Sequence, residues 1–526
     1  MPMTESLRWA LDRAALIAPE RTAVIDGDIT YDYAELARRV GGLGGGLQSL
    51  GIGKGDVVGV LALNGHRHLD YWLGVPAIGA VLNDLNFRLS EDELAFIIDD
   101  CGTAALAVDD MHAGIGGRLR ERCPTLTTLV HLGDGPAPAG FASHDELLGH
   151  TAATAVPLGA EDIGGVFYTG GTTGRPKGVL LSHRNLVANA KHALLAIRHT
   201  PEERYLHAGP MFHLADGSQT YAVTWIAGTH VFVPAFDADL VGRVIERERV
   251  TLLLIVPSMI NMFVNHPGTA ERDLSSLRLL LYGASPMPDQ LQEAAMKLLP
   301  CDFSQLYGMT EAAPLLTQCS PEDHRRGATG EQPYAGRLRS AGAPVIGVQV
   351  EVHREDGTRA AQSEVGEIWA RGPNIMTGYL NRPDETAAVL DDEGWYHSGD
   401  AAWADENGYI YIVDRLKDMI ISGGENVYSA EVENVLYTHP DVLEAAVIGV
   451  PDDAWGERVH AVVVARPGAE PDVEDLIAHC RAKLGGFKVP RSVDFRDDAL
   501  PKSGAGKILK RELRQPYWAG HDRGVN

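Results

Sequence analysis

The residues with the clearest chemical potential lie in one loop, whose sequence at 168–179 is YTGGTTGRPKGV. Its glycines let main-chain N–H groups come close to a phosphate, its threonine hydroxyls can donate to phosphate oxygens, and Lys177 adds positive charge. It is not the common P-loop, because Pro176 stands where that pattern needs a glycine before the lysine. We predict an unusual phosphate-binding loop, with a flexible surface loop as the alternative. The candidate phosphate-binding residues are Thr169, Gly170, Gly171, Thr172, Thr173, Gly174 and Lys177.

The segments on either side of this loop predict the elements that position it. The apolar run at 166–168 indicates a buried strand before the loop. After the loop, Ser182 and Asn185 can cap a helix that continues to about Ile197. The predicted order is therefore strand, phosphate loop, helix.

The region from 161 to about 325 predicts a parallel sheet covered by helices on both faces. Short apolar runs alternate there with helical patterns, and Pro257 suits a helix start. In such sheets ligands sit beyond the carboxyl ends of the strands, where four unusual loops follow the runs. The runs are 163–168, 204–208, 251–256, 278–282 and 302–307, and the loops are 168–179, 211–213, 283–286 and 307–311.

The remaining segments complete a predicted α/β fold of two domains. From about 335 to 413 the apolar period changes to two, which predicts a small antiparallel barrel or sheet. After residue 418 an independent α+β unit of about 110 residues begins. The glycine-rich stretch 41–46 lies in a helical pattern, so close helix packing is expected there instead of phosphate binding.

Length and composition narrow the class of protein. A chain of 526 residues is too long for one core, and its formal net charge of −25 argues against a nucleic-acid or acidic-membrane partner. Five cysteines without C-x-x-C spacing fit a reducing compartment. No apolar run approaches about 20 residues and no signal-peptide pattern stands at the start. We expect a cytoplasmic protein without a transmembrane segment.

Several separated motifs together resemble the adenylate-forming acyl-CoA synthetase family, which also contains adenylation domains and beetle luciferases. The resemblance covers essentially the whole chain, and the motifs stand in the family's order. They are YTGGTTGRPKGV at 168–179, YGMTE at 307–311, HSGD at 397–400, DRLKDMIISGGEN at 414–426 and PKSGAGK at 501–507. Two departures are Gly170, where the family more often has serine, and the lysines at 502 and 510, where it often has arginine.

The resemblance implies a nucleotide site. The 168–179 loop would hold the β- and γ-phosphates of ATP, and Glu311, with Thr172, would hold Mg²⁺. An ionised carboxylate such as Asp400 can accept both ribose hydroxyls. The remaining residues of this implied site are Gly283, Ala284 and Tyr307 at adenine, Gly308 beside it, Thr310 at the α-phosphate, Arg415 at the ribose, and Lys507 between nucleotide and acid.

The resemblance also implies sites for an acid and for CoA. His213 would lie beside the carboxylate, and Gly423, Gly424 and Glu425 would border the pantetheine channel. Because Lys507 and Gly424 lie on opposite faces of the small unit in this family, that unit would rotate about a hinge at Lys417. The implied domains are 1–415 and a mobile 417–526. The implied acyl pocket draws on Asp216, Tyr221, Trp225, Tyr282, Leu306, Pro314 and Leu315.

The resemblance implies two half-reactions, in which an acid is joined to AMP and the acyl group then passes to the thiol of CoA. The mostly apolar pocket residues favour an acid with an uncharged tail: a medium- or longer-chain fatty acid first, an aromatic acid second. Other readings stay open: an enzyme that loads a carrier protein, a luciferase-type monooxygenase, or a degenerate AMP sensor. A homodimer is a further open alternative. Taken alone, Glu311, His213, Asp400, Arg415 and Lys507 each also fit a purely structural role, and Trp455 fits one better than a CoA contact.

Overall fold

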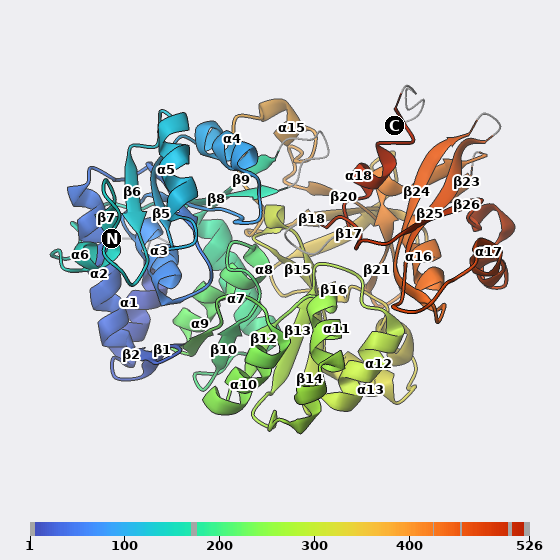
Figure 1. Ribbon diagram of the computed structural model, residues 1–526, viewed down its shortest axis with the longest axis horizontal. Coiled ribbons are helices and arrows are strands. Elements are labelled where there is room, and N and C mark those ends of the chain that lie inside the picture. The colour runs from blue at the N-terminus through green and yellow to red at the C-terminus, as the bar shows by residue number, and fades with distance from the viewer. Residues whose placement is uncertain (1–5, 170–175, 424, 453–454, 503–507, 520–526) are drawn as a thin grey trace.

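The computed structural model describes residues 6–169, 176–423, 425–452, 455–502 and 508–519, without the side chain of Lys417. Three sheets make up the larger part of the chain and a fourth belongs to the C-terminal unit (Figure 1). The predicted α/β class, with a large parallel-sheet domain and a smaller C-terminal domain, is confirmed. In the part of the chain that the structure describes, no helix combines the length and apolarity needed to cross a membrane.

The first sheet has nine strands and carries four of the five predicted runs as parallel neighbours. Most residues of β10, β12 and β13 are buried between helices, which explains their continuous apolar sequences, whereas the carboxyl half of β14 is only partly buried. In spatial order the strands are β16 (Ala343–Pro344), β15 (Leu315–Cys319), β14 (Asp302–Gly308), β13 (Leu279–Gly283), β12 (Leu252–Leu254), β10 (Arg204–His207), β11 (Thr229–Phe232), β1 (Thr22–Asp26) and β2 (Ile29–Asp32).

The fifth run forms β8 (Ile163–Thr169), and its predicted place beside the other four is wrong. It belongs to a second, eight-stranded sheet, where it lies parallel to β4 and antiparallel to β9. In spatial order that sheet contains β19 (Gly378–Tyr379), β9 (Lys177–Ser182), β8, β4 (Val81–Asp84), β3 (Val57–Leu61), β5 (Thr103–Val108), β6 (Thr128–His131) and β7 (Ala142–Ser143).

The phosphate loop therefore joins two antiparallel strands, which corrects the predicted order of strand, loop, helix. Thr169 pairs with Lys177, and the fully buried Val179 and Leu181 alternate on one face of β9 as a strand requires. The helix α7 (His183–Ile197) begins only after β9. Ser182 caps it together with Asn185 in a reciprocal capping box, as the sequence predicts.

Helices cover both large sheets. The glycine-rich stretch lies in α2, where a Cβ at Gly42 or Gly45 would collide with main-chain oxygens of Leu148 or Thr151, so the predicted close packing is confirmed. The other helices of this part are α1 (Arg8–Ile17), α2 (Tyr33–Ser49), α3 (His66–Ala77), α4 (Glu91–Cys101), α5 (Ala113–Arg122), α6 (His144–Leu148), α8 (Leu214–Gly217), α9 (Gln219–Trp225), α10 (Ala238–Glu248), α11 (Pro257–Asn265), α12 (Asp289–Leu298), α13 (Pro321–Ala328), α14 (Tyr334–Arg337) and α15 (Pro383–Ala387).

Two smaller units complete the chain. The segment predicted as a barrel or a sheet forms a four-stranded antiparallel sheet in the order β17 (Gln349–His353), β18 (Gly366–Arg371), β20 (Tyr396–Ala404), β21 (Ile410–Arg415). The C-terminal unit, drawn in orange and red in Figure 1, contains the predicted α+β elements. These are β22 (Ile420–Ser422), β23 (Glu425–Val427), α16 (Ser429–Tyr437), β24 (Val442–Asp452), β25 (Gly456–Ala465), α17 (Val473–Arg481), β26 (Ser492–Arg496) and α18 (Lys510–Arg514).

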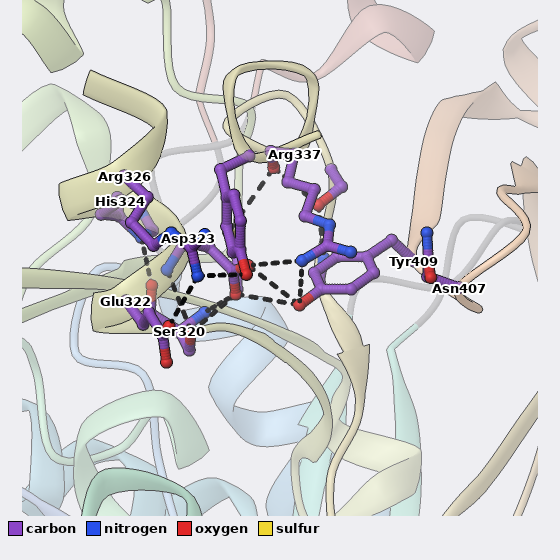
Figure 2. Close-up of polar contacts among 12 residues, drawn as sticks. Ser320, Glu322, Asp323, His324, Arg326, Arg337, Asn407 and Tyr409 are labelled. Atoms are coloured by element: carbon purple, nitrogen blue, oxygen red, sulfur yellow. Dashed lines mark hydrogen bonds and ion pairs between the residues drawn. The ribbon is translucent and has the colours of Figure 1, made fainter. Parts of the chain in front are cut away.

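A polar network fastens the four-stranded sheet to helices α13 and α14 of the first sheet's layer (Figure 2). The carboxylate of Asp323 accepts from the hydroxyl of Tyr409 at 2.9 Å, from that of Ser320 at 2.6 Å and from Arg337 at 3.2 Å. The guanidinium carbon of Arg337 also lies 4.0 Å from the ring centroid of Tyr409 and 4.8 Å from that of Tyr334. Ion pair, hydrogen bonds and cation–π contacts here share one arginine, which fixes the approach of the two layers.

A buried histidine links the N-terminal segment to α7. His183, the first residue of α7, is fully buried, and its Nδ1 accepts a hydrogen bond of 3.2 Å from the main-chain N–H of Leu7. Because Nδ1 accepts, the ring is neutral. Burial lowers the pKa of His183 to about 4, against the opposing charge of Asp162.

We predict that His183 makes folding acid-sensitive in a defined window. Below pH 6.5 the unfolded chain binds a proton at this residue, whereas the folded chain does so only near its lowered pKa of about 4. The free energy of unfolding should therefore fall by about 3 kcal/mol across that window through this residue alone. Replacement of His183 by Gln, which retains an acceptor but does not titrate, should remove that part of the pH dependence in urea unfolding.

The exposed His150 offers the matched control, and His150→Gln should leave the pH dependence as in the parent chain. If the free energy of unfolding depends on pH in the same way in the parent chain and in His183→Gln, His183 is not the source of the acid sensitivity.

Candidate functional site

The carboxyl ends of β13 and β14 approach neighbouring main chain so closely that only glycine fits. A Cβ at Gly283 would collide with the carbonyl oxygen of Leu306, and a Cβ at Gly308 with that of Pro314. Ala284, which follows Gly283, has the left-handed φ of +65° that L-residues rarely adopt. The structure thus brings together the two loops predicted to hold adenine, with their main chain facing one another.

Tyr307 and Asp400 meet across two sheets. Tyr307 is at the end of β14, Asp400 is in β20, and the tyrosine hydroxyl donates to the carboxylate at 2.7 Å. Burial and the charge of Asp400 hold the pKa of Tyr307 well above its ordinary value, so the hydroxyl stays a donor. Arg415 is paired with Asp400 in the strand register, and its Nε lies 3.4 Å from the other carboxylate oxygen. Three predicted residues thus form one constellation.

Glu367, which the sequence analysis did not single out, supports the turn just before Asp400. Gly399 has a φ of +70°, and its N–H donates to one carboxylate oxygen of Glu367 at 2.8 Å. The other oxygen of Glu367 accepts from the indole N–H of Trp369 at 3.1 Å. The Trp369 ring in turn lies between His353 and His397, with centroids 4.1 and 3.9 Å away. For Glu367 the sequence offers only the alternation of polar and apolar residues in β18, and that pattern does not show which group its carboxylate bonds.

Glu311 and Lys177 are brought to the same tyrosine. The hydroxyl of Tyr379 donates to Oε1 of Glu311 at 2.9 Å, and Nζ of Lys177 lies 4.9 Å from the Tyr379 ring centroid. Lys177 also forms an ion pair with Glu385. In the described part of the chain, Oε2 of Glu311 makes no hydrogen bond. A single carboxylate with a free oxygen fits Mg²⁺, which proteins commonly hold with one or two carboxylates plus substrate phosphates.

Asparagines fasten the loop that carries Thr310 and Glu311. The side chain of Asn374 donates to the carbonyl of Ala312 at 2.8 Å and to that of Leu315 at 3.0 Å. The main-chain N–H of Leu315 donates to Asn189 of α7 at 3.0 Å. Since α7 follows the phosphate loop through β9, the same helix supports both halves of the predicted site.

The predicted acyl pocket is only partly assembled around His213. His213 stands at the start of α8, with its ring 5.2 Å from that of Phe212. Leu306 and Pro314 are partly exposed at the end of β14, and Leu315 is buried beside them. These three stay candidates for contact with an acid.

Three other predicted pocket residues point into the core instead. Asp216 accepts from the hydroxyl of Tyr205 at 2.8 Å and bonds His207 at 2.7 Å, because a buried carboxylate must be paired. The hydroxyl of Tyr221 donates to a main-chain carbonyl of α3 at 2.9 Å, and that of Tyr282 lies 2.8 Å from a ring nitrogen of a histidine in α13. Their polar groups are used in internal bonds, and a role for these three residues in the acyl pocket stays a prediction.

Trp225 lies at the edge of the sheet opposite the nucleotide constellation. It is the last residue of α9, which belongs to the crossover from β10 to its parallel neighbour β11. A crossover returns the chain from the carboxyl end of one strand to the amino end of the next. Trp225 is therefore at the amino ends of the strands, and its role in the acyl pocket stays a prediction.

In the C-terminal unit, Gly423 packs against Trp455. Gly423 has a φ of +62°, its N–H donates to the carbonyl of Trp455 at 2.9 Å, and a Cβ there would collide with the indole. The guanidinium of Arg491 covers the same ring at 4.2 Å, and Glu425 is exposed nearby in β23. Other predicted residues lie outside the described part of the chain, and their roles stay predictions: Gly170, Gly171, Thr172, Thr173, Gly174, Gly424 and Lys507.

Comparison with known proteins supplies the family. Residues 11–380 match the profile of "AMP-binding enzyme", and residues 431–507 match that of "AMP-binding enzyme C-terminal domain". The chain belongs to the AMP-binding enzyme family. This confirms the resemblance to adenylate-forming enzymes that the motifs carry.

Relatives of this AMP-binding enzyme align along almost their whole length. A feruloyl-CoA synthase from Amycolatopsis is 41% identical over 97% of this chain and 98% of its own. The fatty acid–[acyl-carrier-protein] ligase ScoC of Streptomyces coeruleorubidus is 36% identical over 100% of this chain and 99% of its own. The crystal structure of ATP-bound MatB from Rhodopseudomonas palustris superposes with a TM-score of 0.88 at 29% identity, covering 99% of this chain and 100% of that one.

We predict that Glu367 supports AMP binding without touching the nucleotide. The carboxylate of Glu367 accepts from the N–H of Gly399 and from the indole N–H of Trp369. In Glu367→Gln one of these two acceptor oxygens becomes an N–H₂ donor, so one of the two bonds is lost. We expect the binding free energy of AMP to fall by about 1.4 kcal/mol, which is a tenfold weaker Kd in isothermal titration calorimetry.

The exposed Glu393 on the neighbouring turn provides the matched control, and Glu393→Gln should bind AMP as the parent chain does. Unchanged affinity in Glu367→Gln would show that Asp400 needs no such support.

Proposed function

We propose that the protein is an ATP-dependent carboxylic acid–CoA ligase that works through an acyl-adenylate. The observation that carries this proposal is the constellation of Tyr307, Asp400 and Arg415 at the strand ends. A half-buried aromatic ring beside a carboxylate that can accept two hydroxyls suits a purine riboside. Family membership and the relatives that act on acids support the same reading.

The proposed first step joins the acid to AMP. A carboxylate oxygen of the acid attacks the α-phosphorus of ATP, an oxygen–phosphorus bond forms, and pyrophosphate leaves. Two anions must meet in this step, so positive charge and N–H donors have to offset their repulsion. In this proposal Lys177 and the loop before it serve the leaving phosphates, Lys507 serves the reacting carboxylate, and Mg²⁺ held by Glu311 would neutralise phosphate charge.

The proposed second step transfers the acyl group to CoA. The thiol sulfur attacks the carbonyl carbon of the adenylate, the carbon–oxygen bond to phosphate breaks, and AMP leaves with the electron pair. Gly423, Gly424 and Glu425 would border the pantetheine channel in this step. No covalent enzyme intermediate is required.

The two steps call for two placements of the C-terminal unit, and we place the domains at 1–415 and 417–526 with a hinge at Lys417. One bond crosses the hinge. Asp414, before it, accepts from the hydroxyl of Ser429, after it, at 2.6 Å. Asp418 lies 3.4 Å from Arg514 within the C-terminal unit itself. A rotation at Lys417 would break the first contact and leave the second in place.

For the acid, the surroundings of His213 favour a compact, aromatic molecule over a long chain. His213 and Gly217 are one helical turn apart and share a face of α8. A side chain at Gly217 would collide with the indole of Trp72, which is itself stacked on Phe167 at 5.6 Å. The space one turn beyond His213 is thus filled by core aromatic rings. The medium- or long-chain fatty acid that the sequence favours is the second candidate, and it would need another path.

The test is CoA-dependent release of pyrophosphate with ferulate, benzoate, octanoate and palmitate. The proposal expects turnover with CoA present and the highest kcat/KM for ferulate or benzoate. Absence of turnover with every acid would overturn it. Transfer only to the phosphopantetheine of a carrier protein, with none to free CoA, would favour the carrier-loading alternative.

We predict that Trp72 limits the length of the acid. Replacement of Trp72 by Phe removes part of the indole beside Gly217, so the kcat/KM ratio of octanoate to ferulate should rise about tenfold, the order expected for one or two methylenes of space. Trp225→Phe, at the opposite edge of the sheet, is the control and should leave the ratio unchanged. An unchanged ratio in Trp72→Phe, or palmitate as the best substrate of the parent chain, would contradict the closure by Trp72.

A further inference from the structure

A cavity of 420 Å³ lies at the edge of the first sheet's layer opposite the nucleotide constellation. It is formed between α1, α7 and the end of α9, where apolar walls come from Ile17, Leu194 and Ile226. Two arginines, Arg13 and Arg21, and the indole of Trp225 complete its lining. The volume falls in the range of sites that hold small organic molecules.

The two arginines of this cavity have no carboxylate partner among the described residues. Arg13 donates to the carbonyl of Trp225 at 2.5 Å, and Arg21 donates to that of Pro201 at 3.2 Å. By contrast, Arg8, on the same helix as Arg13, pairs with a carboxylate one turn away at 3.1 Å. A guanidinium has five N–H donors, and each of these two uses one for a main-chain carbonyl. Both side chains are exposed, so their remaining donors are open to water or to a bound molecule.

The indole of Trp225 forms part of the cavity wall. Its Nε1 is buried and has no hydrogen-bond partner in the part of the chain that the structure describes. Because almost none of the surface of Nε1 is accessible, a molecule in the cavity would meet the ring and not the N–H. Two guanidinium groups without carboxylate partners thus stand at a cavity with apolar walls.

We propose that this cavity binds an organic anion, a carboxylate on a compact apolar body. A carboxylate offers up to four acceptor sites and no donor, which matches the remaining N–H donors of two guanidinium groups. Apolar walls and the ring of Trp225 suit the rest of the molecule. The bound acid would touch the far end of the α8–α9 segment, whose other end begins at His213.

The site is separate from the place where the reacting acid is proposed to bind. The cavity is at the amino ends of the parallel strands, whereas His213 and the nucleotide residues are at their carboxyl ends. Octanoate is a suitable probe, with octan-1-ol as the uncharged molecule of similar shape and inorganic phosphate as an anion without an apolar body.

The experiment is calorimetric titration of octanoate into the full chain, with the reaction site filled by feruloyl-sulfamoyl-adenosine. The proposal expects one octanoate per chain under these conditions, with no binding of octan-1-ol and at least tenfold weaker binding of phosphate. Arg13→Met and Arg21→Met should each weaken octanoate binding at least tenfold. Arg8→Met should have no effect.

The proposal is overturned if the parent chain binds no octanoate, or binds it equally well in Arg13→Met and Arg21→Met. Phosphate that binds as tightly as octanoate would also overturn it, because an apolar body would then add nothing. If an arginine variant fails to fold, Arg13→Lys and Arg21→Lys decide the matter in the same titration. Since the arginine variants lie far from the nucleotide constellation, their failure to bind octanoate is distinct from any failure to make adenylate.

Discussion

The hydrogen bond from Tyr307 to Asp400 is the contact on which the nucleotide site depends. It joins the end of a parallel strand to a strand of the four-stranded antiparallel sheet, so neither residue can be placed without the other. Asp400 is only 7% exposed, and a carboxylate in that setting has to be paired and hydrogen-bonded. The network of Asp323, Arg337 and Tyr409 joins the same two layers at a second place (Figure 2). The layers that carry Tyr307 and Asp400 are therefore connected by more than one contact.

In this acidic chain, anionic ligands have to be bound by donors close to them. Its net charge of −25 repels anions at a distance, so each proposed anionic ligand must be met by donors at short range. At the nucleotide end these are main-chain groups at glycines, with Lys177 held at the ring of Tyr379. At the opposite edge they are the two arginines at the second cavity. Local donors thus mark both ends of the parallel strands.

Local signals in the sequence predicted local structure well. The capping box at Ser182, the helix start at Pro257 and the four parallel runs follow from propensity and periodicity, which depend on residues close in the chain. The placement of 163–168 in the second sheet could not be predicted, because strand partners are set by contacts distant in sequence. The acyl pocket is implied by family position and not by a local pattern, so the sequence alone does not place its members in space. Trp225 is an example, because the crossover of α9 carries it to the edge opposite His213.

The central claim, that an acid oxygen becomes bonded to the phosphorus of AMP, can be tested by isotope transfer. Ferulate labelled with ¹⁸O in both carboxylate oxygens is turned over with ATP and CoA, and the nucleotide product is analysed by mass spectrometry. The account predicts AMP that carries one ¹⁸O atom for each acyl-CoA formed. Unlabelled AMP, or ADP with the label in inorganic phosphate, would contradict it.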